Sequence, residues 1–302
     1  MKLFLLYLLF GIVSYGNTTL AQTKQDYTEY YNHILQIEEF ISNEKFTEAL
    51  SIYKRVFDTY KFVYAKDAYN ACQISCMIHD ANAEYYILRC ALAGVPKNTL
   101  LQSFFVRAQF IQDSATLNTK FDSLLQEYNK TINQPLRNEF MHRFTTEQEH
   151  KGKPDYKNIC TDNFNRIMQL ASRDTFPGEK TIGINDALEN SFVSATLKHY
   201  PYSYALLKQY ISNAILHGEL QPLQAMYIYS FNQTRTSVLY TNNIQTDTSN
   251  FTVCYNLPFG KQSQNVDEVN KQRKLMFISP TYVHAKMEAV MSKYRFSYNF
   301  GY

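Results

Sequence analysis

Residues 133–302 hold four side chains that can act together in acid–base chemistry: Glu147, His199, Tyr240 and Arg273. A carboxylate can orient or deprotonate a neighbour, an imidazole can shuttle a proton near neutral pH, and a guanidinium can hold an anion. If the four serve one purpose, we expect at least three of their side chains within about 8 Å of a common point. The alternative is a buried polar network that fixes helices to one another.

A second group of ligand-type side chains lies closer to the start of the chain: Cys72, Cys76, His79 and Cys90. The spacing fits zinc, but free cysteine is also a common core residue where helices pack tightly, and we favour the core. On one helix the Cβ atoms of Cys72 and Cys76 are about 6 Å apart, whereas a disulfide needs about 3.8 Å. A turn at 79–81 instead places Cys90 opposite Cys72, as a core contact or a disulfide.

Composition and motifs exclude several classes of protein. The sequence lacks the HExxH, Walker, GxSxG and dinucleotide-binding motifs, and we expect no cofactor and no metal ion. The formal net charge is only +3, which argues against nucleic acid as a partner. A polybasic tract and a second long apolar run are both missing, which argues against a stable membrane anchor. With nucleic acid and a membrane anchor disfavoured, we expect a protein or a peptide as the partner. The sequence leaves the oligomeric state open.

The first 21 residues have the pattern of a secretory signal peptide. Lys2 precedes an apolar run over 3–13, and small residues follow at peptidase spacing, either Thr19 and Ala21 before Gln22 or Ser14 and Gly16 before Asn17. The run is well short of the roughly 20 residues that span a bilayer as a helix. We therefore expect a mature protein that begins at Gln22 and is exported, to either the periplasm or the medium.

Residues 27–94 predict two helical hairpins. Apolar residues recur every three or four positions, first as Tyr30, Ile34, Ile37 and Ile41. The hairpins begin about 34–37 residues apart, and the stretches EKFTEALSIYKRVFDTY and DAYNACQISCMIHDANAEYYILRCALAGV resemble tetratricopeptide repeats, which have that period. Small residues stand where neighbouring helices must approach closely: Ala49, Ala71 and Ala91. Two more helices are expected over 98–131. The resemblance implies a stack with a concave surface for peptides or partner proteins.

A domain boundary is predicted just before Pro135, which suits the first turn of a new helix. It separates a helical domain over 22–132 from an α-rich domain over 133–302. Within the second domain, β-branched and aromatic residues predict a hairpin at 236–257, and the strict alternation over 294–302 predicts a strand beside it. The predicted fold class is mainly α: a tetratricopeptide-like stack, then an α-rich domain with a small antiparallel β-sheet.

The segment 133–302 resembles a family of bacterial domains with no established function. The matched positions are Leu136, Arg137, Glu139, Glu147, Gln148, Asp162, Asn163, Pro177, Gly183, His199, Tyr240, Val269, Asn270 and Arg273. All four candidate site residues are among them. The chain departs from the family pattern at Glu147, which replaces an aspartate, at 230–232, where an Asp-Arg pair is missing, and at Thr241, which replaces a glycine. If the family site is catalytic, the resemblance implies that this chain has lost the activity or changed its substrate.

Two functions therefore compete. The leading hypothesis is an exported protein-interaction or scaffold protein, because helical repeats supply binding surfaces and nothing in the sequence demands chemistry. The alternative is an enzyme, for example a hydrolase, that uses the Glu/His/Tyr/Arg group. Convergence of the four side chains in an open cleft would favour the enzyme. Scatter, or burial with every partner satisfied, would favour the scaffold.

Overall fold

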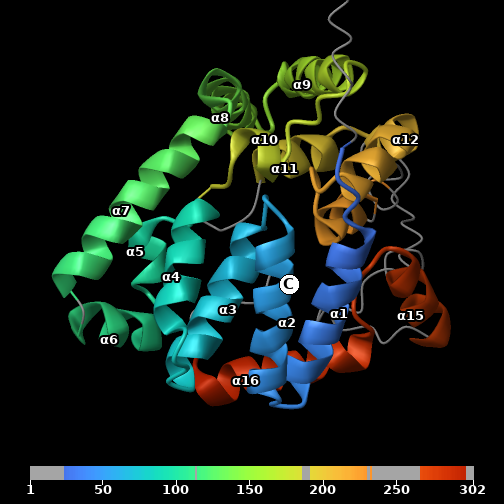
Figure 1. The fold of residues 1–302 in the computed structure, drawn as a ribbon. Coiled ribbons are helices and arrows are strands. Elements are labelled where there is room, and N and C mark those ends of the chain that lie inside the picture. Colours follow the sequence, from blue (N-terminus) through green and yellow to red (C-terminus); the bar gives the residue numbers. More distant parts are fainter. Residues whose placement is uncertain (1–23, 113, 186–190, 230–231, 233–265, 297–302) are drawn as a thin grey trace, which may run out of the picture.

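The structure is a computed structural model that describes residues 24–112, 114–185, 191–229, 232 and 266–296. Within these ranges the chain is mainly helical (Figure 1), and its buried apolar residues form one large cluster and two smaller ones. In chain order the helices are α1 (Thr28–Ser42), α2 (Phe46–Thr59), α3 (Ala65–Met77), α4 (Ala83–Leu92), α5 (Lys97–Leu100), α6 (Phe104–Gln112), α7 (Ser114–Thr131), α8 (Gln134–Glu149), α9 (Tyr156–Ala171), α10 (Glu179–Ile182), α11 (Ser191–His199), α12 (Ser203–Leu216), α15 (Val266–Leu275) and α16 (Thr281–Tyr294). Residues 222–229 are also helical.

The first four helices form two stacked pairs, α1 with α2 and α3 with α4 (Figure 1). The small residues expected at the close approaches are all fully buried: Ala49, Ala71 and Ala91. Gly94 ends the second pair with a φ of 79°, and a Cβ at this position would lie 2.2 Å from the Tyr128 ring. Only glycine fits there, because the backbone is left-handed and the ring of α7 packs directly on it. The prediction of stacked helix pairs is confirmed.

The expected contact between Cys72 and Cys90 is also confirmed. Both thiols are fully buried where α3 meets α4, and the Cys72 thiol interacts directly with those of Cys76 and Cys90. Each of these cysteines carries a free thiol in the structure. Burial raises the pKa of the Cys72 thiol well above its ordinary value, so the group is neutral and packs as a small apolar side chain.

Tyrosines fill the core of the helix pairs. Tyr27, Tyr30, Tyr53, Tyr64, Tyr69 and Tyr86 are among the largest fully buried side chains. Their hydroxyls reach polar partners, as in the bond from Tyr86 Oη to the Leu50 carbonyl at 2.8 Å. Such a ring adds apolar area to the core, and its buried hydroxyl still makes a hydrogen bond. The high tyrosine content therefore has a structural explanation in this half of the chain.

The end of the described chain returns to its beginning. α16 crosses beneath the first helices and packs against α1 (Figure 1). Its buried face consists of Val283, Met287 and Val290, which join the same apolar cluster as α1 to α7. A second cluster is built by α8, α9, α11, α12 and 222–229, with residues between Leu136 and Ile228. The predicted division into 22–132 and 133–302 remains a prediction, and α16 packs with helices of the first range.

The prediction of a small antiparallel β-sheet is wrong for the part of the chain that the structure describes, which contains helices and no strand. The alternation predicted as a strand from Tyr294 onward begins inside a helix. Val283, Met287, Val290 and Tyr294 repeat every three or four residues, and this helical period prevails up to Arg295, which ends α16 in a left-handed conformation. The hairpin at 236–257 and residues 297–302 lie outside the described residues.

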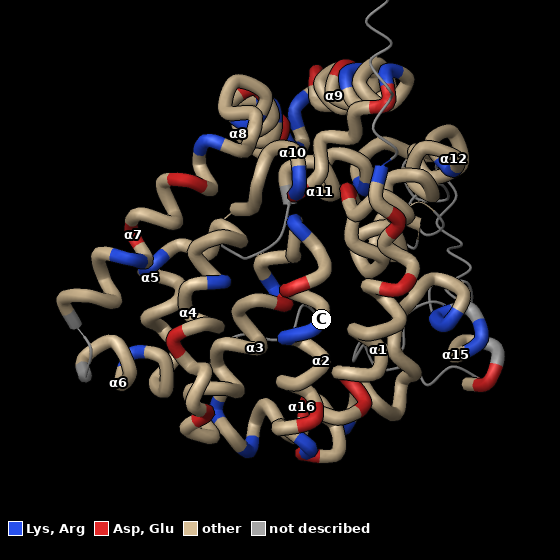
Figure 2. The backbone as a smooth tube through the Cα atoms, viewed as in Figure 1, with Lys and Arg blue, Asp and Glu red and all other residues tan. Residues whose placement is uncertain are grey.

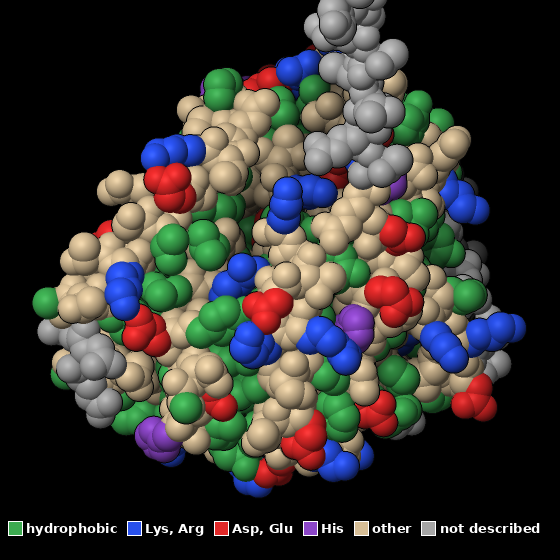
Figure 3. Space-filling view, in the orientation of Figure 1, with side chains coloured by type: hydrophobic (Ala, Val, Ile, Leu, Met, Phe, Trp, Pro, Cys, Tyr) green, Lys and Arg blue, Asp and Glu red, His purple; other side chains and the backbone are tan. Residues whose placement is uncertain are grey.

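Charges of both signs are interspersed along the helices (Figure 2). On the face shown in Figure 3, Lys and Arg side chains alternate with Asp and Glu, and hydrophobic side chains lie between them. None of the helices in the described ranges is long and apolar enough to cross a membrane.

Candidate functional site

Two of the four expected site residues meet in a buried carboxylate–imidazole pair. Glu147 lies on the inner face of α8, seven residues after the buried Phe140, and is fully buried. Its Oε1 receives a hydrogen bond from Nδ1 of His199, the last residue of α11. Its Oε2 accepts a bond from Asn163 Nδ2 of α9 at 2.8 Å. One carboxylate therefore joins three helices, and both of its oxygens are engaged.

The pair lies behind a polar groove between α8 and α9. The groove has a volume of about 520 Å³ and is lined by Glu139, His142, Arg143, Thr146, Asn158, Ile159, Asp162 and Asn163. Asn163 belongs to both sites, because its Oδ1 accepts a bond from Arg143 Nη1 at 3.2 Å. The imidazole of His199 lies against the Tyr156 ring, with the ring centroids 6.2 Å apart.

Ion pairs hold the outer side of this groove. Glu139 accepts hydrogen bonds from Arg166 Nε at 2.7 Å and from Arg143 Nε at 2.9 Å. The bond from Arg166 and the adjacent Arg143 lower the pKa of the Glu139 carboxyl, which therefore stays ionised. Arg143 also pairs with Asp162 at 2.6 Å. These side chains neutralise one another and link α8 to α9.

Arg273 does not join this pair. It lies on α15, which is well apart from α8 and α9 in Figure 1, and its Nε donates to the Ser279 carbonyl at 2.6 Å. Ser279 Oγ in turn donates to Glu38 of α1. Tyr240, the fourth expected residue, lies outside the described residues. The structure thus brings two of the four residues together, and the expected convergence of three is not found among those it describes.

Arg273 instead stabilises the connection from α15 to α16 together with Asn270, which lies one turn earlier on α15. Asn270 Oδ1 accepts the backbone N–H of Thr281 at 2.9 Å and the Thr281 hydroxyl at 3.1 Å. Thr281 is the first residue of α16, so this amide satisfies an N–H group that has no partner within the helix. Both side chains of the matched Asn-x-x-Arg pattern therefore hold the connection from α15 to α16, which is a structural function.

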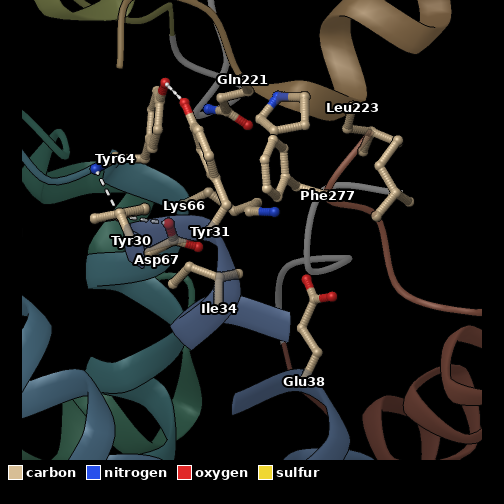
Figure 4. A pocket seen from close by; sticks show the side chains of 12 residues that line it. Tyr30, Tyr31, Ile34, Glu38, Tyr64, Lys66, Asp67, Gln221, Leu223 and Phe277 are labelled. Atoms are coloured by element: carbon tan, nitrogen blue, oxygen red, sulfur yellow. Dashed lines mark hydrogen bonds between the residues drawn. The ribbon is translucent and has the colours of Figure 1, made fainter. Parts of the chain in front are cut away.

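A second polar site, which the sequence did not predict, lies between α1, α3 and the C-terminal half. We call it the tyrosine chamber, a space of about 40 Å³ lined by Tyr30, Tyr31, Ile34, Glu38, Tyr64, Lys66, Asp67, Gln221, Pro222, Leu223, Phe277 and Ile278 (Figure 4). A water molecule needs roughly 10–15 Å³ of such space, so the chamber has room for a few waters. Its aromatic rings come from both halves of the chain.

Hydrogen bonds inside the tyrosine chamber fix most of its polar groups. Tyr30 Oη donates to Asp67 Oδ2 at 2.6 Å, and Tyr31 Oη is 3.0 Å from Tyr64 Oη (Figure 4). Tyr31 Oη also donates to the Ile215 carbonyl at 2.8 Å. Burial raises the pKa values of Tyr30 and Asp67, so the phenol remains a donor. These bonds hold helices together, and a phenol such as Tyr30 with a raised pKa is not activated as a nucleophile.

Glu179 of α10 closes the same junction from the other side. It is buried, and its Oε1 accepts the backbone N–H of Ala65 at 2.7 Å while Oε2 accepts from Gln221 Nε2 at 2.8 Å. Burial raises the pKa of this carboxyl to about 8. The preceding Gly178 allows the fit, because a Cβ there would overlap the Glu219 carbonyl oxygen at 1.4 Å.

Periodicity could have shown that these tyrosines and acids are buried but not that they meet, because the chamber joins segments that are far apart in the chain. Among the described residues no group of three or more His, Cys, Asp or Glu side chains is arranged to hold a metal ion. Comparisons of the chain with family models, with curated proteins and with solved structures found no match. The function must therefore be argued from the fold and these sites alone.

Proposed function

We propose that the protein is an exported protein-interaction or scaffold protein built on tetratricopeptide-like helix pairs. The observation that carries the proposal is an apolar groove along α1, the first helix of the stacked pairs. Stacked helix pairs commonly offer such surfaces to peptides and partner proteins. The saturation of the Glu147 carboxylate and the structural bonds of Arg273 add support, because both side chains are occupied in holding helices together.

The groove lies between α1 and the segment that joins α15 to α16. Its volume is about 560 Å³, and it is lined by Leu35, Gln36, Glu39, Asn270, Lys271, Lys274, Ile278, Pro280, Tyr282 and Val283. Tyr282 is 57% exposed, so much of its ring is open to contact by a partner. Exposed aromatic anchors next to basic side chains suit a peptide with apolar residues and an acidic flank. This is the partner class that the groove favours.

A site-specific photo-crosslinker tests this function. Benzoylphenylalanine replaces Tyr282 in the exported protein, and the control replaces Tyr202, which has a similar exposed fraction of 51% and is not among the groove residues. We expect a defined adduct on irradiation from position 282 and none from 202. Charge reversal of Lys271 and Lys274 to Glu should reduce that adduct. Equal adducts at both positions, or none at 282, would contradict the proposed groove.

An enzyme is the second candidate, and one observation favours it. The Glu147–His199 pair lies behind the open polar groove between α8 and α9, and a carboxylate that orients an imidazole is a common acid–base unit. The test is turnover of ester, amide and glycoside substrates by the purified protein, compared with the His199→Ala variant. Turnover that is lost in a variant with unchanged folding would favour the enzyme over the scaffold.

A further inference from the structure

The buried thiols on α3 and α4 do more than fill space once the chain is exported. Cys72 interacts with Cys90 across the two helices and with Cys76 along its own helix. The neighbours of Cys72 and Cys90 are Ala71 and Ala91, which are fully buried and small enough to let the two helices pack closely. Two cysteines that touch across facing helices are therefore candidates for a disulfide, whereas an i, i+4 pair on one helix has its Cβ atoms too far apart.

We propose that Cys72 and Cys90 form a disulfide that locks α3 to α4 in the exported protein, with Cys76 left as a free thiol. The inference rests on the proposed export, because only an oxidising compartment sustains such a bond. The oxidant is a small or protein disulfide. A thiolate of Cys72 attacks it and releases one thiol, and the thiolate of Cys90 then attacks the mixed disulfide and releases the second. The two cysteines lose two protons and two electrons, which the oxidant takes up as two thiols.

The bond must form while the chain folds. In the closed structure both cysteines are fully buried, which keeps an oxidant away from their sulfurs. During folding the same thiols are exposed, and the pairing of α3 with α4 brings them together. After closure, burial shields the bond from reductants in the same way. The lock therefore protects the second helix pair, α3 with α4, against opening.

Refolding of the purified mature chain with glutathione disulfide tests the bond without any need for export. Trypsin cleaves after Lys66, Arg89 and Lys97, so Cys72 and Cys76 share the peptide 67–89 while Cys90 lies in 90–97. We expect these two peptides to remain joined in the absence of reductant, with a loss of two hydrogens. The Cys76→Ser variant should keep the junction, and Cys72→Ser and Cys90→Ser should lose it.

Three results would overturn the inference: full recovery of reduced thiols, a bond within 67–89, or a junction that survives in Cys72→Ser. Thermal unfolding supplies an independent readout. The oxidised protein should unfold several degrees above its reduced form, and Cys90→Ser should show no difference between oxidising and reducing conditions. The start of the mature chain, measured separately, shows whether export itself fails, so the two hypotheses can be distinguished.

Discussion

Glu179 accepts the backbone N–H of Ala65 at 2.7 Å, so a carboxyl from α10 satisfies the first helical residue of α3. The N-terminus of a helix exposes N–H groups without partners in the helix, and a side chain from outside must supply the acceptor when that end is buried. Here the acceptor comes from a segment more than a hundred residues further along the chain. The helix pairs and the second core are thus joined through this buried carboxyl, and its protonation state affects both.

The first prediction concerns pH. The pKa of Glu179 is raised by burial to about 8, so the folded chain binds this proton more tightly than the unfolded chain. The contribution to stability is complete below the unfolded pKa of about 4.3 and is lost as the pH rises toward 8. Glu179→Gln carries no such proton. From pH 5 to pH 8, we expect wild type to lose up to about 4 kcal/mol of unfolding free energy relative to Glu179→Gln.

Urea unfolding at several pH values measures this difference. Glu139→Gln is the control. The bond from Arg166 lowers the pKa of the Glu139 carboxyl, so the contribution of Glu139 to stability is lost as the pH falls, which is the opposite direction to that of Glu179. A wild type and a Glu179→Gln variant with parallel pH profiles would show that the buried carboxyl does not titrate in this range.

The second prediction concerns the carboxylate–imidazole pair. His199→Ala leaves the fully buried Glu147 with one oxygen unpaired, which should lower the unfolding free energy by about 1–3 kcal/mol. His142→Ala is the matched control, because His142 lies exposed on α8 and lines the groove without contacting Glu147. Chemical denaturation of both variants measures the effect. Equal stability of the two would show that the pair does not hold α8 to α11.

The sequence predicted the helix pairs well because the decisive signals are local. The stripe of Ile34, Ile37 and Ile41 is buried as expected, and Pro135 lies in the first turn of α8. The sequence was less informative for Arg273, which was expected to join His199 on the strength of a resemblance alone. Residue type and order along the chain do not fix where a side chain lies, and the guanidinium of Arg273 instead donates to the Ser279 carbonyl.

The tyrosine chamber shows where sequence reasoning fails physically. Tyr30 and Asp67 are each explained by the buried face of their own helix, and periodicity cannot tell which distant segment covers that face. The covering residues, such as Phe277, come from a connection without periodicity of its own. The strand predicted over 294–302 was wrong at its start, because Tyr294 belongs to the helical stripe of Val283, Met287 and Val290 that packs α16 against the first helices.

The third prediction concerns the connection from α15 to α16. Asn270→Ala removes the acceptor of the Thr281 N–H and should cost about 0.5–2 kcal/mol of unfolding free energy. Asn138→Ala is the control, because Asn138 is exposed in the middle of α8 and alanine favours that helix. Thermal or urea unfolding of Asn270→Ala and Asn138→Ala measures the difference in their stability. A variant at position 270 that is as stable as the control would mean that the amide does not cap α16.

The fourth prediction concerns export, on which the proposed function depends. We expect the positive residue and the short apolar run followed by Thr19 and Ala21 to direct the chain to a secretory peptidase, so that the mature protein begins at Gln22. The salt bridge from Lys24 to Glu219 at 3.0 Å lies on the C-terminal side of this cleavage site, so the mature chain keeps both of its partners. Intact-mass measurement of the protein recovered outside the cytoplasm checks this start.

Ala21→Arg should block cleavage, because peptidase sites require small residues, while Gln22→Glu, just beyond the site, should still be cleaved. Recovery of the wild-type chain with residues 1–21 still attached would contradict the prediction and remove the oxidising environment that the Cys72–Cys90 bond requires.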